Sequence, residues 1–159
     1  IATPSSKGKT TILNIINGNI QSESILINDK PINDKIKSKI TLINANVNYY
    51  SKTVLEELML VTNNIIRIKK YLKDFKLLSY IKKSPYKLSY VQMQKLNLIK
   101  ALLNKSEIIL IDNILSYFDK YSKIEYMGLL KKYQIDKEKT IIFTTTNLED
   151  AIFFIDECI

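Results

Sequence analysis

The 159-residue sequence has no histidine or tryptophan, and it holds one cysteine, three glycines and three prolines. The lack of histidine excludes histidine acid–base catalysis and histidine-ligated zinc. Cys158 has no partner for an internal disulfide, which indicates a reducing compartment. The longest apolar runs, such as "AIFFI", are too short to span a bilayer, and we expect no signal peptide. Direct insertion into a membrane is therefore not expected.

The charge of the chain is basic, with 24 lysines and arginines against 16 acidic residues and a formal net charge of +8. Such a charge suits an acidic partner such as nucleic acid or a lipid surface. However, the lysines are spread along the chain with no basic run longer than two, and Arg67 is the sole arginine. Because surfaces that read guanine or stack on RNA use more arginine, the pattern favours a solvated basic surface. A nucleic-acid-binding protein remains the less favoured alternative.

The chain length fits one domain, and the 46% hydrophobic and 25% charged residues are ordinary for a globular protein. Ile1 has the character of a strand end, so we expect the chain to begin inside a larger domain. Apolar spacing predicts these elements in order: a helix from Lys9 that stops at Gly18, a hairpin within 23–32, a strand over 39–44, two or three helices over 53–83, a helix after an N-cap at Ser89, a buried strand over 107–112, a helix over 119–133, a strand over 140–145 and a helix over 148–154. This alternation predicts an α/β fold with a mainly parallel sheet flanked by helices.

The stretch "TPSSKGKT", residues 3–10, ends like the phosphate-binding pattern GxxxxGK[ST]. Gly8, Lys9 and Thr10 match the pattern, whereas Thr3 stands where its first glycine belongs. In such a loop the backbone N–H groups and the positive helix end face the phosphates, and the lysine reaches the terminal phosphates. The threonine hydroxyl ligates magnesium. The stretch therefore predicts a site for the phosphates of a nucleotide and for Mg²⁺.

A carboxylate at the end of an apolar strand is the second requirement of a magnesium–nucleotide site. Asp112 follows "IILI" and meets this requirement. Asp119, further along, could be either a helix N-cap or a functional loop contact. Taken singly, "GKT" could be a chance match, and Asp112 could merely cap the strand. Together, in this order and on these elements, they predict a P-loop nucleotide fold.

Six ordered segments make the chain similar to the ATP-binding domain of ABC transporters along nearly its whole length. They are "TPSSKGKTTILNIING" (Walker A), "ESILINDKPI" (the following hairpin), "INANVNYYSKTVLEEL" (the Q-loop), "LSYVQMQKLNLIKALL" (the LSGGQ signature), "EIILIDNILSYFD" (Walker B and D-loop) and "TIIFTTTNLEDA" (the switch strand). The resemblance implies one partial domain over 1–159, truncated at both ends, with a helical insert at about 53–87. It also implies the nucleotide-binding residues Ser6, Gly8, Lys9, Thr10, Thr11, Asn44 and Ser89, with Thr10 and Asp112 on Mg²⁺.

The departures from the family pattern fall on catalytic positions. The glutamate that serves as base after Walker B is Asn113, and the switch histidine is Thr146. An amide cannot take a proton from water, and loss of a general base costs roughly 10² to 10⁴ in rate. Tyr90 and Val91 replace the two signature glycines and are expected to obstruct the approach to the γ-phosphate of a dimer partner. The Q-loop glutamine is Asn44, and Ser6 replaces another Walker A glycine, at a cost of roughly 1 kcal/mol in backbone strain.

The resemblance thus implies the nucleotide-binding subunit of an ABC transporter, with weak or absent hydrolysis. Its expected partners are a transmembrane permease subunit and a second ABC domain, identical or different. Its expected place is cytoplasmic, peripheral on the inner face of the membrane through the permease. A non-catalytic protein that keeps the ABC surface to dock on a membrane subunit or an intact paralogue is the alternative.

Overall fold

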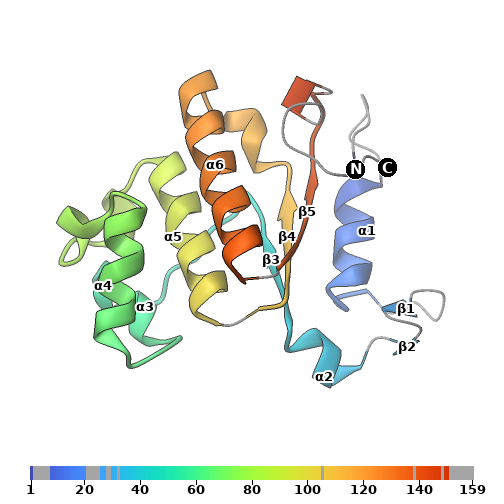
Figure 1. The fold of residues 1–159 in the computed structure, drawn as a ribbon, viewed down its shortest axis with the longest axis horizontal. Coiled ribbons are helices and arrows are strands. Elements are labelled where there is room, and N and C mark those ends of the chain that lie inside the picture. Colours follow the sequence, from blue (N-terminus) through green and yellow to red (C-terminus); the bar gives the residue numbers. More distant parts are fainter. Residues whose placement is uncertain are drawn as a thin grey trace. The chain divides into compact units, whose positions relative to one another are not determined.

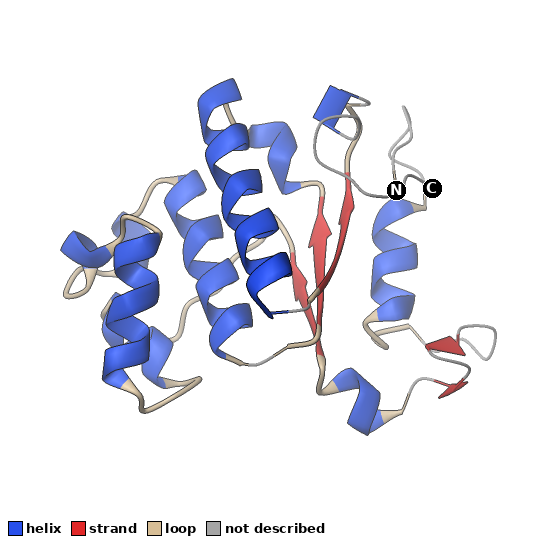
Figure 2. Cartoon of the chain, in the orientation of Figure 1, coloured by secondary structure: helices blue, strands red, loops and turns tan. Residues whose placement is uncertain are grey.

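The computed structural model describes residues 1, 8–20, 26–27, 30–31, 33–104, 106–137, 139–147 and 149–150. The chain divides into two compact units, unit 1 (1–45 and 106–159) and unit 2 (46–105). Figure 1 labels their elements and Figure 2 colours them by type. Unit 1 contains α1 (Lys9–Ile16), β1 (Leu26–Ile27), β2 (Lys30–Pro31), α2 (Asp34–Lys37), β3 (Ile40–Ile43), β4 (Ile108–Asp112), the 3₁₀ helix η3 (Ile114–Tyr117), α6 (Lys120–Lys137) and β5 (Thr140–Thr144). Unit 2 contains α3 (Val54–Met59), α4 (Ile65–Asp74), the 3₁₀ helices η1 (Leu78–Tyr80) and η2 (Pro85–Lys87), and α5 (Tyr90–Leu103).

Unit 1 is built on a parallel three-stranded sheet in the order β3-β4-β5. The central strand β4 is apolar without interruption, as expected of a strand covered on both faces. Figure 1 shows α1 and α6 on opposite sides of this sheet. Both the α/β class and the buried parallel strand that the sequence predicts are confirmed.

The core between α1 and the sheet holds α1 in place. Leu13 is fully buried and packs against Ile40 and Leu110. Even-numbered residues of the strands surround them, because side chains two apart share one face of a sheet; they are Leu42, Ile108 and Ile142. This packing fixes the helix whose first turn carries Lys9 and Thr10.

Several local predictions in unit 1 are confirmed. Helix α1 begins at Lys9, and Gly18 stands just after its end with φ +75°, a conformation that glycine adopts readily. The hairpin is present, with Leu26 opposite Pro31 and Ile27 opposite Lys30. Ile1, expected as a strand end, is not assigned to a strand, although its N-terminus donates to Phe143 O at 3.0 Å and its carbonyl accepts from Thr145 N at 3.2 Å.

The helices of unit 2 begin at residues whose side chains cap them. Thr53 and Glu56 form a reciprocal capping box at α3, and Asn64 accepts from Arg67 N at the start of α4. Ser89 caps α5 as predicted, with Gln92 completing a second box. The prediction of two or three helices over 53–83 is confirmed by α3, α4 and the short η1.

Two helices were predicted near the C-terminal end of the sequence; the structure shows a different end for the first and describes only two residues of the second. Helix α6 was expected over 119–133, but it runs to Lys137, because residues 134–137 contain no glycine or proline to stop it. Its predicted start is nearly right, since Asp119 is the capping residue and Lys120 the first helical one. The expected helix over 148–154 lies outside the described residues, apart from Glu149 and Asp150, which are helical.

Candidate nucleotide-binding site

The carboxyl end of β4 and the first turn of α1 meet through one hydrogen bond. Thr10 Oγ1 donates to Asp112 Oδ2 at 2.8 Å, across 102 positions of the chain. Thr10 is exposed and Asp112 half-buried, so the bond lies at the protein surface. The structure therefore brings together the hydroxyl and the carboxylate that the sequence assigns to Mg²⁺.

The other Asp112 oxygen is held by a residue that the sequence reasoning missed. Thr144 Oγ1 donates to Asp112 Oδ1 at 2.9 Å and accepts from Asn113 N at 3.1 Å. Thr144 ends β5, is buried, and pairs with Asp112 in the parallel register. The available signal was a threonine at the end of the strand that neighbours "IILID". Asp112 is thus oriented by two hydroxyl groups from two different elements.

Gly8 and Lys9 stand at the beginning of α1. Gly8 has φ +88°, and a Cβ built on it would meet no atom within 4 Å. Its requirement for glycine is therefore conformational and not steric. No side chain caps the helix at Gly8, so the first-turn N–H groups have no capping partner on that residue. Together with the helix dipole, such groups favour an anion. Lys9 is 3% exposed and adds a positive charge to this end of the helix.

Two further predicted residues lie at the same end of unit 1. Thr11 is exposed in the first turn of α1. Asn44 is exposed and follows β3 directly, one position beyond the pairing of Ile43 with Ile111. Because parallel strands end at one edge, Asn44 belongs to the same edge as Asp112. Ser6 and Thr3 lie outside the described residues.

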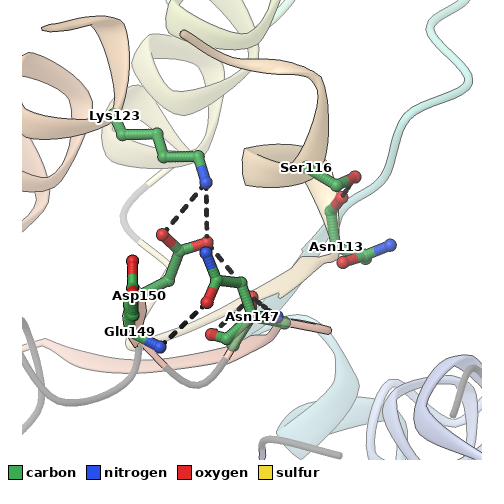
Figure 3. A network of polar contacts seen from close by, with 7 residues as sticks. Asn113, Ser116, Lys123, Asn147, Glu149 and Asp150 are labelled. Carbon is green, nitrogen blue, oxygen red and sulfur yellow. Dashed lines mark hydrogen bonds and ion pairs between the residues drawn. The ribbon is translucent and has the colours of Figure 1, made fainter. Parts of the chain in front are cut away.

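Asn113 occupies a strained backbone position directly after β4. Its φ is +49° and its ψ +26°, the left-handed region that asparagine tolerates better than most residues. Its backbone carbonyl accepts from Ser116 Oγ at 2.8 Å, which Figure 3 shows. The Oδ1 atom is buried and accepts no hydrogen bond from the described residues. An amide at this position is a poor proton acceptor.

The segment that follows β5 is held by polar contacts to α6, drawn in Figure 3. Lys123 Nζ on α6 donates to both carboxylate oxygens of Asp150 at 3.0 Å. Thr145 Oγ1 donates to Asp150 Oδ2 at 3.3 Å and accepts from Asn147 N at 3.0 Å. These contacts hold Thr145 and Asn147, the two chain neighbours of the exposed Thr146, which is the predicted switch position. The sequence reasoning missed Lys123 and Asp150, which are 27 positions apart.

Asp119 caps α6 through contacts with Ser122. It accepts from Ser122 N at 3.0 Å and from Ser122 Oγ at 2.6 Å. The hydrogen bond from the Ser122 hydroxyl is the main cause that lowers the pKa of the Asp119 carboxyl, and the bond from the Ser122 backbone adds to it. Of the two roles considered for Asp119, the structure shows the N-cap.

Ser89, in unit 2, is bonded as a helix cap. Its Oγ accepts from Gln92 N at 3.3 Å, and its N donates to Gln92 Oε1 at 3.0 Å. Tyr90 and Val91 form the first turn of α5, where the ABC signature has glycines. The first turn therefore carries two bulky side chains next to Ser89.

A buried ion pair inside unit 2 was also missed. Glu57 is fully buried, and its Oε1 accepts a hydrogen bond from Lys100 Nζ at 2.5 Å. Its Oε2 accepts hydrogen bonds from the backbone N atoms of Tyr50 and Ser51. Burial alone raises the pKa of Glu57, but these hydrogen bonds outweigh it and leave the pKa below its usual value. Tyr49 adds a bond from its hydroxyl to Met93 O at 3.1 Å. The segment after Asn44 is thereby tied to α3 and α5.

Comparisons with known proteins agree with this geometry. Residues 2–116 match the family profile described as ABC transporter. The Fe(3+) ions import ATP-binding protein of Fusobacterium nucleatum is 30% identical over 162 residues, which are 94% of this chain and 44% of that protein. A solved bacterial ABC transporter cassette in dimeric form is 26% identical, with a TM-score of 0.78 over 96% of this chain and 76% of that chain.

A second solved structure shows the fold alone, at 21% identity. It is cbiO1 from Clostridium perfringens, part of the ABC transporter complex cbiONQ, with a TM-score of 0.85 over 98% of this chain and 70% of that chain. The chain spans less than two thirds of the length of the curated relatives it matches first. Among the described residues, no helix combines the length and apolar character needed to cross a membrane. The family match and the P-loop fold together place this chain in the family of ABC transporter ATP-binding domains.

Proposed function

We propose that this chain is the nucleotide-binding subunit of an ABC transporter and binds MgATP through a degenerate P-loop, with weak or absent hydrolysis. The contact between Thr10 Oγ1 and Asp112 Oδ2 at 2.8 Å carries the proposal. Magnesium prefers one or two protein oxygens and takes its other ligands from phosphate and water. A hydroxyl and a carboxylate in contact at a helix N-terminus fit that preference.

The binding residues have separate tasks. Thr10 and Asp112 would hold Mg²⁺, which neutralises phosphate charge when bound. Lys9 and the first-turn N–H groups of α1 bind the phosphates themselves. Thr11, Asn44 and Ser6 complete the nucleotide contacts, and Ser89 contributes from the signature to a partner's nucleotide.

The loss of hydrolysis follows from two positions. Asn113 stands at the general-base position and has no basic oxygen, and the exposed hydroxyl of Thr146 cannot act as an imidazole. Thr144 accepts a hydrogen bond from Asn113 N, and Asp150 accepts one from Thr145, the residue before Thr146. Both positions are thus held by hydrogen bonds to or beside them. The site thus retains the parts that bind nucleotide and lacks the part that activates water.

The proposed partners are a transmembrane permease subunit and a second ABC domain. Similar proteins support both, since one is an import ATP-binding protein, one is part of a transporter complex and one is dimeric. Through the permease, the chain would lie peripherally on the inner, cytoplasmic face of the membrane. Tyr90 and Val91 next to Ser89 favour a partner that does not need this chain's signature for catalysis.

A calorimetric titration with ATP tests the binding proposal. Wild-type protein is titrated with and without Mg²⁺, beside Lys9→Ala and the matched control Lys35→Ala, an exposed lysine on α2. We expect saturable binding that strengthens with Mg²⁺, weakens at least tenfold in Lys9→Ala, and is unchanged in Lys35→Ala. Equal loss in both variants, or no binding by wild type, would contradict the proposal.

A docking protein without nucleotide is the alternative that this titration separates. That alternative predicts no Lys9-dependent heat and intact complex formation by Lys9→Ala. It is favoured by the replaced glycines at Tyr90 and Val91, but it leaves unexplained why Thr10 and Asp112 keep their contact.

A further inference from the structure

The positive charge of the chain is concentrated in one unit. Residues 46–105 contain 12 basic and 3 acidic residues, a formal charge of +9, whereas the remaining residues contain 12 basic and 13 acidic ones, a charge of −1. The 60 residues of unit 2 carry as many basic residues as the other 99, and far fewer acidic ones. A count of basic runs along the sequence does not reveal this.

The acidic residues of unit 2 do little to offset that charge at its surface. Glu57 is fully buried and paired with Lys100. Only Glu56, within the capping box of α3, and the half-buried Asp74 remain. The exposed lysines of unit 2 therefore face solvent with little local compensation.

Helix α4 carries three of the exposed lysines of unit 2 on one side. Its buried residues are Ile68, Tyr71 and Leu72, and its exposed residues are Ile65, Ile66, Lys69, Lys70 and Lys73. At about 100° per residue, these five exposed positions fall within a stripe of roughly 140° on the outward side of the helix. The stripe contains no acidic residue. Two isoleucines also lie in it, and Ile66 is 84% exposed.

We propose that this stripe, the α4 face formed by Ile65, Ile66, Lys69, Lys70 and Lys73, is an interaction surface for the headgroups of anionic lipids. Lysine ammonium groups are attracted to an anionic leaflet, and exposed isoleucine can enter the boundary of headgroups and acyl chains. Nucleic acid fits less well, since single-strand surfaces use aromatic stacking and arginine, and this stripe has neither. The proposal rests on the proposed function in one respect: binding to a permease subunit would bring unit 2 to a membrane.

Vesicle co-sedimentation tests the surface. The whole chain is mixed with phosphatidylcholine vesicles, with or without phosphatidylglycerol, at low and at physiological salt. The test variant carries Lys69→Gln, Lys70→Gln and Lys73→Gln. The control carries Lys35→Gln, Lys120→Gln and Lys131→Gln, three exposed lysines of unit 1, so both variants lose three charges.

Wild type is expected to bind the phosphatidylglycerol vesicles and not phosphatidylcholine alone, more weakly as salt rises. One lysine near an anionic surface contributes about fivefold in affinity, so the test variant should bind on the order of 100-fold more weakly at low salt. The control should stay near wild type. A further variant, Ile66→Ser, should weaken the binding that persists at physiological salt.

Three results would overturn the proposal: no binding to anionic vesicles, equal loss in both triple variants, or tighter binding to a single-stranded oligonucleotide with the same dependence on the α4 lysines. The last would identify nucleic acid as the partner. A cooperative thermal unfolding transition, measured for each variant, serves as the control for folding. ATP titration of the same samples keeps the two proposals apart, because the α4 variants should bind nucleotide like wild type.

Discussion

Thr144 offers a sharp test of the site, because one hydroxyl serves both Asp112 and Asn113. In Thr144→Val the side chain keeps its shape, but the bond to Asp112 Oδ1 at 2.9 Å and the bond from Asn113 N at 3.1 Å are lost. A hydrogen bond to a carboxylate is worth about 1.5–3 kcal/mol and a neutral one about 1 kcal/mol. Asp112 is half-buried and regains water, so we expect a loss of about 2 kcal/mol in the free energy of unfolding.

Thermal unfolding without nucleotide measures this loss. For a chain of this length, about 2 kcal/mol corresponds to a Tm lower by roughly 4–8 °C. Thr144→Ser is the matched control, since it keeps the hydroxyl and removes one methyl group, worth about 0.8 kcal/mol. If the valine variant were as stable as wild type, or the serine variant as unstable as valine, the account of Thr144 would be wrong.

The same variants test whether Thr144 positions Asp112 for magnesium. Loss of a residue that orients a metal ligand typically weakens metal affinity about 10- to 100-fold. The Mg²⁺-dependent gain in ATP affinity should therefore fall by about tenfold in Thr144→Val and persist in Thr144→Ser, whereas affinity in EDTA should be alike in both. A uniform loss with and without Mg²⁺ would show a merely structural role.

Three further variants address other parts of the chain. Glu57→Gln should lower the free energy of unfolding by about 3 kcal/mol near neutral pH, because it removes the buried carboxylate that pairs with Lys100, a lysine whose side chain is 26% exposed. The folded pKa of Glu57 lies below its unfolded value of about 4.3, so the difference from wild type should shrink as denaturation is measured at falling pH through that range. Gly8→Ala should cost about 1–2 kcal/mol in backbone strain and Gly8→Asn less, as measured by chemical denaturation, since a Cβ there meets no atom. Asn113→Glu combined with Thr146→His should raise phosphate release on the order of 10²-fold, because it restores a general base and an imidazole, and an unchanged rate would assign the defect to the signature.

Local patterns predict much of this fold. The helix from Lys9 and the stop at Gly18 follow from apolar spacing and a glycine that takes positive φ. The strand before Asp112 follows from an unbroken apolar run. Ser89 was predictable as a cap because the box with Gln92 spans only three positions. These elements depend on neighbours in the sequence, which is why the sequence indicates them.

The contacts that the sequence does not indicate join distant positions. Thr144 meets Asp112 only through the register of β5 on β4, and its place at the end of a strand does not by itself indicate that contact. The pair of Glu57 and Lys100 spans 43 positions, and Lys123 with Asp150 spans 27. The surface of α4 was missed for another reason: its lysines form no basic run longer than two, and the shortage of acidic residues around them is visible only when unit 2 is counted by itself.

The nucleotide recovered from the protein after incubation with MgATP tests the central claim most directly. Wild type and Lys9→Ala are incubated, freed of unbound nucleotide on a desalting column, denatured, and their nucleotide is separated by chromatography. The account predicts ATP on the wild type and little nucleotide on Lys9→Ala. Recovery of ADP with phosphate release near the typical enzyme rate of about 10 per second, or of no nucleotide at all, would contradict it.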